Sequence, residues 1–365
     1  MIYLDHGATS FVKPPQVEEA VIRALHRCAN PGRGGYRQSM EAARTVYSCR
    51  ERAAQLFSCQ PEQVVFTANC TQGLNTAIFS LFSPGDRIVI SGFEHNAVLR
   101  PLYALGAKVI VAGQKLFDWE DTVTEFKKAL EQGADGAVFT HVSNVFGYIL
   151  PVAQLAALCR EYDVPFVIDC AQSAGMLPID FKALGAAAIA MPGHKGLLGP
   201  QGTGMLICKE RMKPLCYGGT GGDSQNRQMP QFLPEGMEAG TLNVPGIAGL
   251  SEGLRYLIHR GVADVGKQAA LQCEICAKGL SSLGYRVFTG EHQLSTVSFV
   301  PDTDCEVFAQ ALSGKGIAVR AGLHCAPLAH ESAGTLQTGT VRVSFGHDAR
   351  FFQTKSLLKA VHQIV

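Results

Sequence analysis

The residue whose type and surroundings best suit it to covalent chemistry is a lysine in the segment AAAIAMPGHKGLLGPQGTGMLIC. Lys195 follows a strand-like run of small residues, and glycines surround it before a second apolar run begins. A lysine in such surroundings is poorly placed to be a solvated surface charge. Loss of solvent lowers the pKa of the amine, and the neutral amine can form a Schiff base with an aldehyde. The sequence therefore predicts an amine nucleophile at Lys195.

An acid and an amide lie at the end of another apolar run, in the segment VPFVIDCAQSAG. Asp169 ends this run and Gln172 follows shortly after it. A carboxylate beside a pyridine nitrogen keeps that nitrogen protonated, and a protonated ring is an electron sink. A helix cap after a strand is the structural alternative for Asp169.

Three more strand-like runs end in polar residues. Thr71 begins an amphipathic helix after VVFT, and a helix N-terminus suits a phosphate. His95 follows RIVIS, where an imidazole can stack on a flat ring or shuttle protons, and Asn144 follows GAVFTHVS, where an amide can bind a carboxylate. The alternatives are an N-cap at Thr71, a capping or surface histidine, and a turn asparagine.

These polar residues need a sheet to bring them together. Short apolar runs alternate with helical patterns such as 16–29 and 153–162, and the runs lie at 64–67, 87–91, 108–113, 136–143 and 165–171. Continuously apolar strands are typical of parallel sheets that are covered on both faces, and ligands bind beyond the carboxyl ends of such strands. The sequence therefore predicts an α/β fold with its site at that edge.

The second half of the chain changes character twice. Residues 212–238 are rich in Gly, Pro and amides, which predicts a long functional loop. A helical stretch follows from about residue 245, and strand-like runs at 295–300 and 315–322 predict a smaller second domain.

Taken together, these segments resemble the class V aminotransferase family of fold type I pyridoxal-phosphate enzymes. The likeness covers nearly the whole chain, through YLDHGAT, FTANCTQGLN, EHNA, HVSNVFG, VIDCAQSAG, GHKGLLGPQGTG and EAGTLN. It implies a large domain with a mostly parallel seven-stranded sheet and a smaller C-terminal α+β domain. We place these at residues 1–250 and 251–365, with residues 1–15 as an N-terminal arm that packs on the small domain.

The resemblance also implies roles for single residues. Lys195 would hold pyridoxal 5'-phosphate covalently, Asp169 would pair with the pyridine nitrogen, and Gln172 would contact the phenolic oxygen. His95 would stack on the ring and take part in catalysis. The implied cofactor-binding set is Thr71, Cys70, His95, Asp169, Gln172, His194, Lys195 and Thr241. Thr71 and His194 would hold the phosphate, and Thr241 would reach the phosphate of a neighbouring subunit, which implies a homodimer.

The reaction is indicated by two C-terminal segments, KGIAVRAGLHCAPLAH and LQTGTVRVSFG. The first resembles the Arg-x-Gly-x-His-Cys-Ala loop of cysteine desulfurases in the group that includes selenocysteine lyases, and its catalytic cysteine matches Cys325. Arg342 would grip the substrate carboxylate with help from Asn144. Arg33, in NPGRGGY, resembles a further site arginine of the family.

The resemblance implies a desulfurase that converts L-cysteine to L-alanine and leaves a persulfide on Cys325, with a sulfur or selenium acceptor protein as partner. The alternatives are a lyase acting on L-selenocysteine, another class V lyase or aminotransferase without a persulfide step, and a non-catalytic scaffold that has kept the fold.

Several positions depart from the family pattern: His6, Gly7, Cys70, Pro192 and Leu323. Cys70 and Pro192 stand where relatives carry hydroxyl donors, which leaves fewer donors for the cofactor phosphate. Arg320 and His324 lie near Cys325 in the sequence, and we expect them to supply positive charge that favours its thiolate.

Composition excludes several classes of partner. The 365 residues include 32 basic and 31 acidic side chains without charge blocks, which argues against nucleic acid or an anionic membrane as partner. No run approaches the roughly 20 apolar residues that span a bilayer. The twelve cysteines are scattered, including the pair Cys273 and Cys276, so the sequence predicts reduced thiols in a cytoplasmic protein and no metal site.

Overall fold

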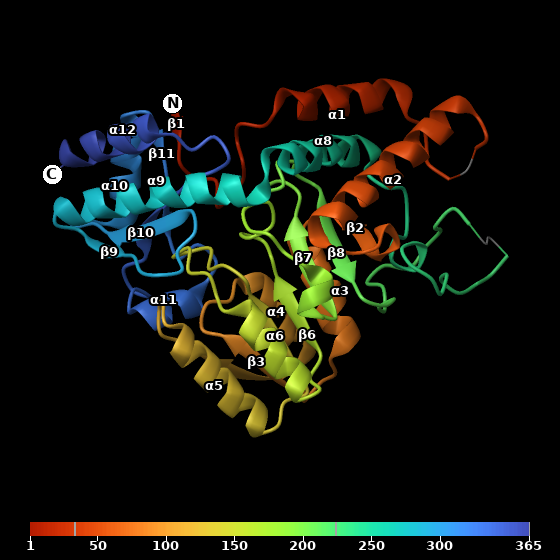
Figure 1. Cartoon of the computed structure of the whole chain (residues 1–365), viewed down its shortest axis with the longest axis horizontal. Coiled ribbons are helices and arrows are strands. Elements are labelled where there is room, and N and C mark those ends of the chain that lie inside the picture. The colour runs from red at the N-terminus through yellow and green to blue at the C-terminus, as the bar shows by residue number, and fades with distance from the viewer. Residues whose placement is uncertain (33, 223–224, 365) are drawn as a thin grey trace.

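A seven-stranded sheet forms the centre of the protein in a computed structural model, which describes residues 1–32, 34–222 and 225–364 (Figure 1). Its strand order is β2-β8-β7-β6-β5-β3-β4. The strands are β2 (Val64–Thr67), β3 (Arg87–Ser91), β4 (Lys108–Ala112), β5 (Gly136–Thr140), β6 (Phe166–Asp169), β7 (Ala188–Pro192) and β8 (Gly204–Cys208). β8 is antiparallel to both of its neighbours, and the other adjacent pairs are parallel. The predicted mostly parallel seven-stranded sheet is confirmed.

Helices cover both faces of this sheet, which explains why its strands are continuously apolar. Successive side chains of a strand point to opposite faces. In β5, Ala137 and Phe139 therefore join the core beneath α5 (Trp119–Glu131) and α6 (Val152–Glu161), whereas Val138 joins the core beneath α3 and α4. α3 spans Cys70–Leu81 and α4 spans Asn96–Leu105, and the short α7 spans Phe181–Leu184.

Four long helices frame the sheet and lead out of it. α1 (Pro15–Arg27) and α2 (Arg37–Phe57) both pack against α8 (Val244–Arg260), and α9 (Val262–Ser282) follows almost directly. In Figure 1 the loop between β8 and α8 projects to the right of the sheet. Within its described part the loop contains one short 3-10 helix, Glu235–Met237. The boundary that we place at residue 250 lies inside α8, and the division into two domains stays a prediction.

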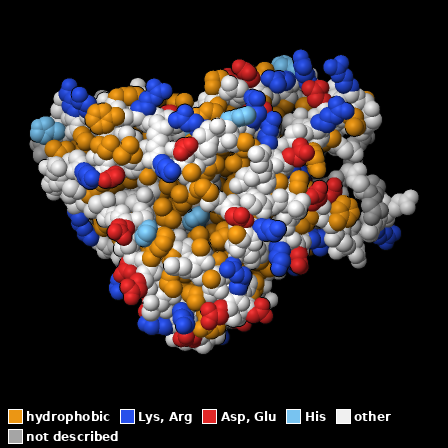
Figure 2. All heavy atoms as spheres, in the orientation of Figure 1, with side chains coloured by type: hydrophobic (Ala, Val, Ile, Leu, Met, Phe, Trp, Pro, Cys, Tyr) orange, Lys and Arg blue, Asp and Glu red, His pale blue; other side chains and the backbone are white. Residues whose placement is uncertain are grey.

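The C-terminal part builds a second, four-stranded antiparallel sheet with the order β12-β13-β10-β9. Its elements are β9 (Arg286–Phe288), β10 (Thr296–Val300), α10 (Cys305–Gly314), β12 (Arg320–Gly322), α11 (Pro327–Ala333), β13 (Thr340–Ser344) and α12 (Phe351–His362). The N-terminal strand β1 (Ile2–Tyr3) pairs in parallel with β11 (Ile317–Ala318) of this part. In Figure 2, hydrophobic side chains gather on the hollowed middle of the molecule, between the C-terminal part and the large sheet.

The CxxC pair of cysteines lies in the interior of the protein. Cys273 and Cys276 are buried on α9 as part of the main core. Among the described residues, we find no helix whose length and hydrophobicity would allow it to cross a bilayer.

Candidate active site

Side chains from five strand ends converge on one recess of about 520 Å³ at the carboxyl edge of the large sheet. Four of these strands, β7, β6, β5 and β3, are parallel neighbours, and β2 runs in the same direction on the far side of the antiparallel β8, so all five end at the same edge. The predicted site residues that line it are Cys70, Thr71, His95, Asn144, Asp169, Gln172, His194 and Lys195.

Lys195 lies in a tight turn directly after β7. The backbone of this turn is fixed because Gly193 donates to the Thr203 carbonyl at 2.8 Å and Leu198 donates to the Lys195 carbonyl at 3.0 Å. A Cβ at position 193 would collide with the Thr203 side chain, so only glycine fits there. Burial lowers the pKa of the Lys195 amine, and the carboxylate of Asp169 partly opposes this effect. A lowered pKa increases the fraction of neutral amine, the form that attacks an aldehyde.

Asp169 ends β6 and is buried. Its Oδ1 accepts hydrogen bonds from the Ala171 amide at 2.8 Å and from the Cys70 thiol at 3.5 Å. Burial raises the pKa of its carboxyl, and the Ala171 hydrogen bond and Lys195 act in the opposite direction. Both hydrogen bonds reach the same oxygen, so Oδ2 is the atom placed to pair with a ring N–H.

Two histidines line the recess, and a backbone amide fixes the tautomer of one of them. His95 caps α4, and its Nδ1 accepts from the Ala97 amide at 3.0 Å, so Nε2 carries the proton of the neutral ring. Nδ1 of His194 lies 3.0 Å from Oγ1 of Thr9. Burial, together with the nearby Lys195, lowers the pKa of both imidazoles to about 4, so both rings are neutral at neutral pH.

The helix that we expect to bind phosphate begins one residue earlier than predicted. α3 starts at Cys70, and the N-cap is Asn69, whose Oδ1 accepts from the Gln72 amide at 2.9 Å. The expectation that Thr71 starts the helix is therefore wrong by one residue, and the alternative that Thr71 is its N-cap is wrong by two. Thr71 itself is exposed and lines the recess.

Cys325 lies on the loop between β12 and α11, and this loop is tied to the recess. Its carbonyl accepts from the Asn96 amide at 2.8 Å, and the preceding carbonyl, of His324, accepts from Asn144 Nδ2 at 2.7 Å. Both His324 and Cys325 have left-handed backbone, with φ of 51° and 58°, which non-glycine residues adopt at a cost. The two anchors hold this strained turn and present the Cys325 side chain to solvent.

His324 does not provide the positive charge that we expected. Its ring is buried, and Nε2 lies 3.2 Å from both the carbonyl and the hydroxyl of Thr340. Burial, with a further contribution from Arg342, lowers its pKa to about 2. A neutral His324 supports the loop structurally. Of the two residues that we expected to supply positive charge near Cys325, only Arg320, which is exposed on β12, is left to do so.

Arg342 lies in β13, and its side chain is only 2% exposed. Its Nη1 donates to the Asn144 carbonyl at 3.0 Å, and its Nη2 forms an ion pair with Asp5 Oδ1 at 2.6 Å. Asn144 therefore connects Arg342 to the Cys325 loop. The sequence reasoning missed Asp5, although the motif YLDHGAT that contains it was recognised.

The remaining predicted residues lie elsewhere or are engaged differently. Thr241 is exposed and lines a different hollow, together with Tyr47 and Phe232. Gln172 Nε2 donates to the carbonyl of Gly7 at 3.0 Å. Arg33 lies outside the described residues.

Glu94 is a second residue that the sequence reasoning missed, although it directly precedes His95. It is fully buried, and its Oε1 accepts from the Ser91 hydroxyl and from the Thr140 amide. Burial raises the pKa of its carboxyl from the ordinary 4.5 to about 8. The signal that could have found it is an acid three residues after the apolar run that forms β3.

This shift predicts a pH-dependent effect of Glu94→Gln on stability. Because the folded-state pKa is raised, the contribution of Glu94 is fully present below about pH 4.5 and is lost as pH rises through about 8. Glutamine stays neutral at every pH. As pH rises across this range, the free energy of unfolding of the variant should therefore increase relative to that of the wild type, by at most about 1.4 kcal/mol per pH unit. Urea unfolding at a series of pH values measures the difference, with the exposed Glu161→Gln as control. A difference that does not change with pH would show that Glu94 is ionised when folded.

The mostly parallel seven-stranded sheet with helices on both faces is the fold of the type I pyridoxal-phosphate enzymes. The family model for aminotransferase class-V matches residues 2–355, and the chain belongs to this family.

Several proteins with similar sequences or structures are named cysteine desulfurases, which is one activity within this family. The chain is 30% identical to a probable cysteine desulfurase of Methanothermobacter thermautotrophicus, covering 94% of this chain and 89% of the relative. It is 31% identical to one of Pyrococcus abyssi, covering 100% and 94%. The solved structure of a cysteine desulfurase from Thermococcus onnurineus superposes with a TM-score of 0.92 at 30% identity, covering 100% of this chain and 94% of that one.

Proposed function

We propose that the protein is a pyridoxal-phosphate-dependent cysteine desulfurase. The net reaction takes L-cysteine and the Cys325 thiol to L-alanine and a Cys325 persulfide. The C–S bond of the substrate breaks, a sulfur–sulfur bond forms at Cys325, and the substrate β-carbon gains a proton. All atoms and electrons of the two thiols appear in the products, so no external oxidant is needed.

The residues of the recess fit the cofactor. A lysine with a lowered amine pKa, a buried carboxylate with one oxygen available and the N-terminus of α3 border the same space. They would hold the aldehyde carbon, the ring nitrogen and the phosphate respectively. Bound there, pyridoxal phosphate supplies an electron sink for the electrons released at the substrate Cα.

The protein supplies proton transfer and orientation. Lys195, once its amine is free, is the base placed to take the Cα proton and later to return a proton to the substrate. Neutral His95 has Nε2–H available beside the recess, because its Nδ1 is held by Ala97. Arg342 would bind the substrate carboxylate, and Asn144 would couple that end of the substrate to the Cys325 loop.

The observation that carries the proposal is the position of Cys325. An exposed thiol lies on a strained turn whose backbone is anchored by Asn96 and Asn144, two residues that follow strands ending at the recess. An aminotransferase or a simple lyase would have no use for a thiol presented in this way. The names of the relatives support the same reaction.

The proposal is tested by incubating the holoenzyme with L-cysteine and, separately, with L-selenocysteine. We expect alanine, together with a mass increase of one sulfur atom on the peptide that contains Cys325. Alanine formed from selenocysteine alone would favour the selenocysteine lyase alternative. Formation of pyruvate or of a keto acid without modified Cys325 would refute a persulfide mechanism.

Arg342→Ala tests how the substrate is held. Loss of a buried, charge-assisted carboxylate contact should raise KM for L-cysteine by about 100-fold, while the cofactor spectrum stays unchanged. Steady-state kinetics and a visible spectrum measure the two effects, with the exposed Arg100→Ala as control. An unaltered KM would place the carboxylate elsewhere.

We further propose a homodimer in which Thr241 completes the site of the second copy. Two large hydrophobic side chains that line the same hollow as Thr241, Tyr47 and Phe232, are exposed. A second copy would cover them. We also propose that the enzyme works in the cytoplasm and passes its sulfur to an acceptor protein at the exposed Cys325.

A further inference from the structure

The N-terminal arm places a carboxylate on the arginine that would bind substrate. Asp5 Oδ1 lies 2.6 Å from Nη2 of Arg342, and the Asp5 side chain is 19% exposed against 2% for Arg342. The two residues are 337 positions apart in the chain. Burial of the guanidinium makes this pair stronger than an ion pair on the open surface.

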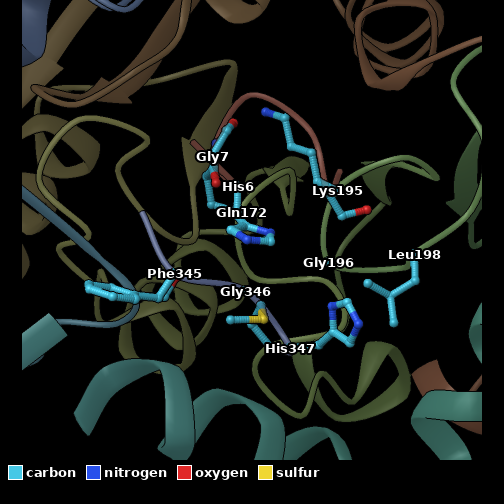
Figure 3. Close-up of a pocket in the computed structure, with 12 residues that line it drawn as sticks. His6, Gly7, Gln172, Lys195, Gly196, Leu198, Phe345, Gly346 and His347 are labelled. Atoms are coloured by element: carbon cyan, nitrogen blue, oxygen red, sulfur yellow. The ribbon is translucent and has the colours of Figure 1, made fainter. Parts of the chain in front are cut away.

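Backbone contacts hold the arm in this position. Leu4 donates to Ala318 at 2.9 Å and accepts from Ser344 at 2.8 Å, and Gly7 donates to the Ser344 hydroxyl at 2.8 Å. A Cβ at Gly7 would lie 3.0 Å from Cζ of Arg342, so the guanidinium lies against bare backbone there. Figure 3 shows His6 and Gly7 beside Gln172, with Lys195 on one side and Gly346 and His347 on the other. The arm is therefore part of the site.

A second carboxylate on Arg342 would lie close to Asp5. Nη1 is used by the Asn144 carbonyl and Nη2 by Asp5, and Nε is buried without a partner. A guanidinium can hold a carboxylate with two parallel bonds on two edges, Nη1 with Nη2 or Nε with Nη2. Both edges include Nη2, which carries one N–H for each edge, and Asp5 accepts one of these two. A substrate carboxylate at the same edge would have to displace Asp5. At the other edge it would lie on the same buried nitrogen as Asp5, where two carboxylates repel each other.

We propose that Asp5 is a specificity-determining residue that occupies the carboxylate position on Arg342 and is displaced when substrate binds. The inference rests on the proposed role of Arg342 in holding the substrate. Exchange of one carboxylate for another keeps the buried guanidinium paired throughout. It also weakens the binding of every ligand that uses Arg342, because the ion pair with Asp5 must first be broken.

The test compares two ligands of the holoenzyme that differ only in a carboxylate, L-alanine and ethylamine. Their dissociation constants are measured from the change in the visible spectrum of the cofactor. In Asp5→Asn, the amide oxygen still accepts from Nη2, but the competing charge is gone. We expect L-alanine to bind about tenfold more tightly to this variant, and ethylamine to bind as it does to the wild type.

Control variants make the result specific. Glu19→Gln removes an exposed acid of α1 and should leave both constants unchanged. Asp5→Ser is measured in parallel, so that the test stands if Asp5→Asn does not fold. Unchanged or weaker alanine binding in the folded Asp5 variants would overturn the proposal, since it would mean that Asp5 does not compete. Neither ligand loses sulfur, so a protein that shows the expected change without desulfurating cysteine would refute only the proposed function.

Discussion

Replacing Lys195 with alanine should abolish the visible colour of the purified protein and lower turnover of L-cysteine by at least about 10⁴-fold. The reason is that, in the proposed mechanism, one amine would perform two tasks: it would fix the aldehyde cofactor and then move the Cα proton. The fold should persist, because Lys195 extends from a turn whose structure depends on Gly193 and Thr203. Absorbance spectra and alanine formation measure the two effects.

Lys182→Ala is the matched control for this variant, since Lys182 is exposed on α7 and does not line the recess. Its colour and activity should equal those of the wild type. A coloured Lys195→Ala protein that still turns over cysteine would show that another amine carries the cofactor.

Replacing Cys325 with serine should lower alanine formation from L-cysteine by about 10³-fold, which corresponds to about 4 kcal/mol of lost transition-state stabilisation. A hydroxyl is a much weaker nucleophile toward sulfur than a thiolate is. Cofactor binding should be unaffected, because the recess residues and the Cys325 side chain belong to different loops. The measurements are the visible spectrum, the rate of alanine formation and the mass of the peptide that contains residue 325.

Cys216→Ser provides the control, since Cys216 is the other exposed cysteine and lies on the loop between β8 and α8. Full activity with L-cysteine in Cys325→Ser would favour a lyase or aminotransferase without a thiol intermediate. Selenium leaves carbon more readily than sulfur, so residual activity toward L-selenocysteine alone would be compatible with the proposed mechanism.

The large sheet could be predicted because its strands carry their signal locally. Residues 64–67 and 87–91 were predicted with the bounds that the structure has, since each run is apolar and ends at a polar or glycine residue. The grouping of Asp169 with Lys195 also followed from the sequence, because β6 and β7 are parallel neighbours, Asp169 ends β6 and Lys195 follows β7.

The parts that could not be predicted depend on contacts between distant segments. Nothing local indicates that Asp5 pairs with Arg342, because β1 must first dock on β11. The neutral state of His324 depends on the burial of the Cys325 loop, which the sequence around it does not reveal. Thr241 lies apart from the recess of its own chain, so its proposed role concerns a second copy.

The most direct test of this account is the site of the covalent bond to the cofactor. The holoenzyme is reduced with sodium borohydride, digested, and its peptides are analysed by mass. We expect a pyridoxyl group on the peptide that contains Lys195 and on no other. A label on a different lysine, or a coloured protein that yields no labelled peptide, would contradict it.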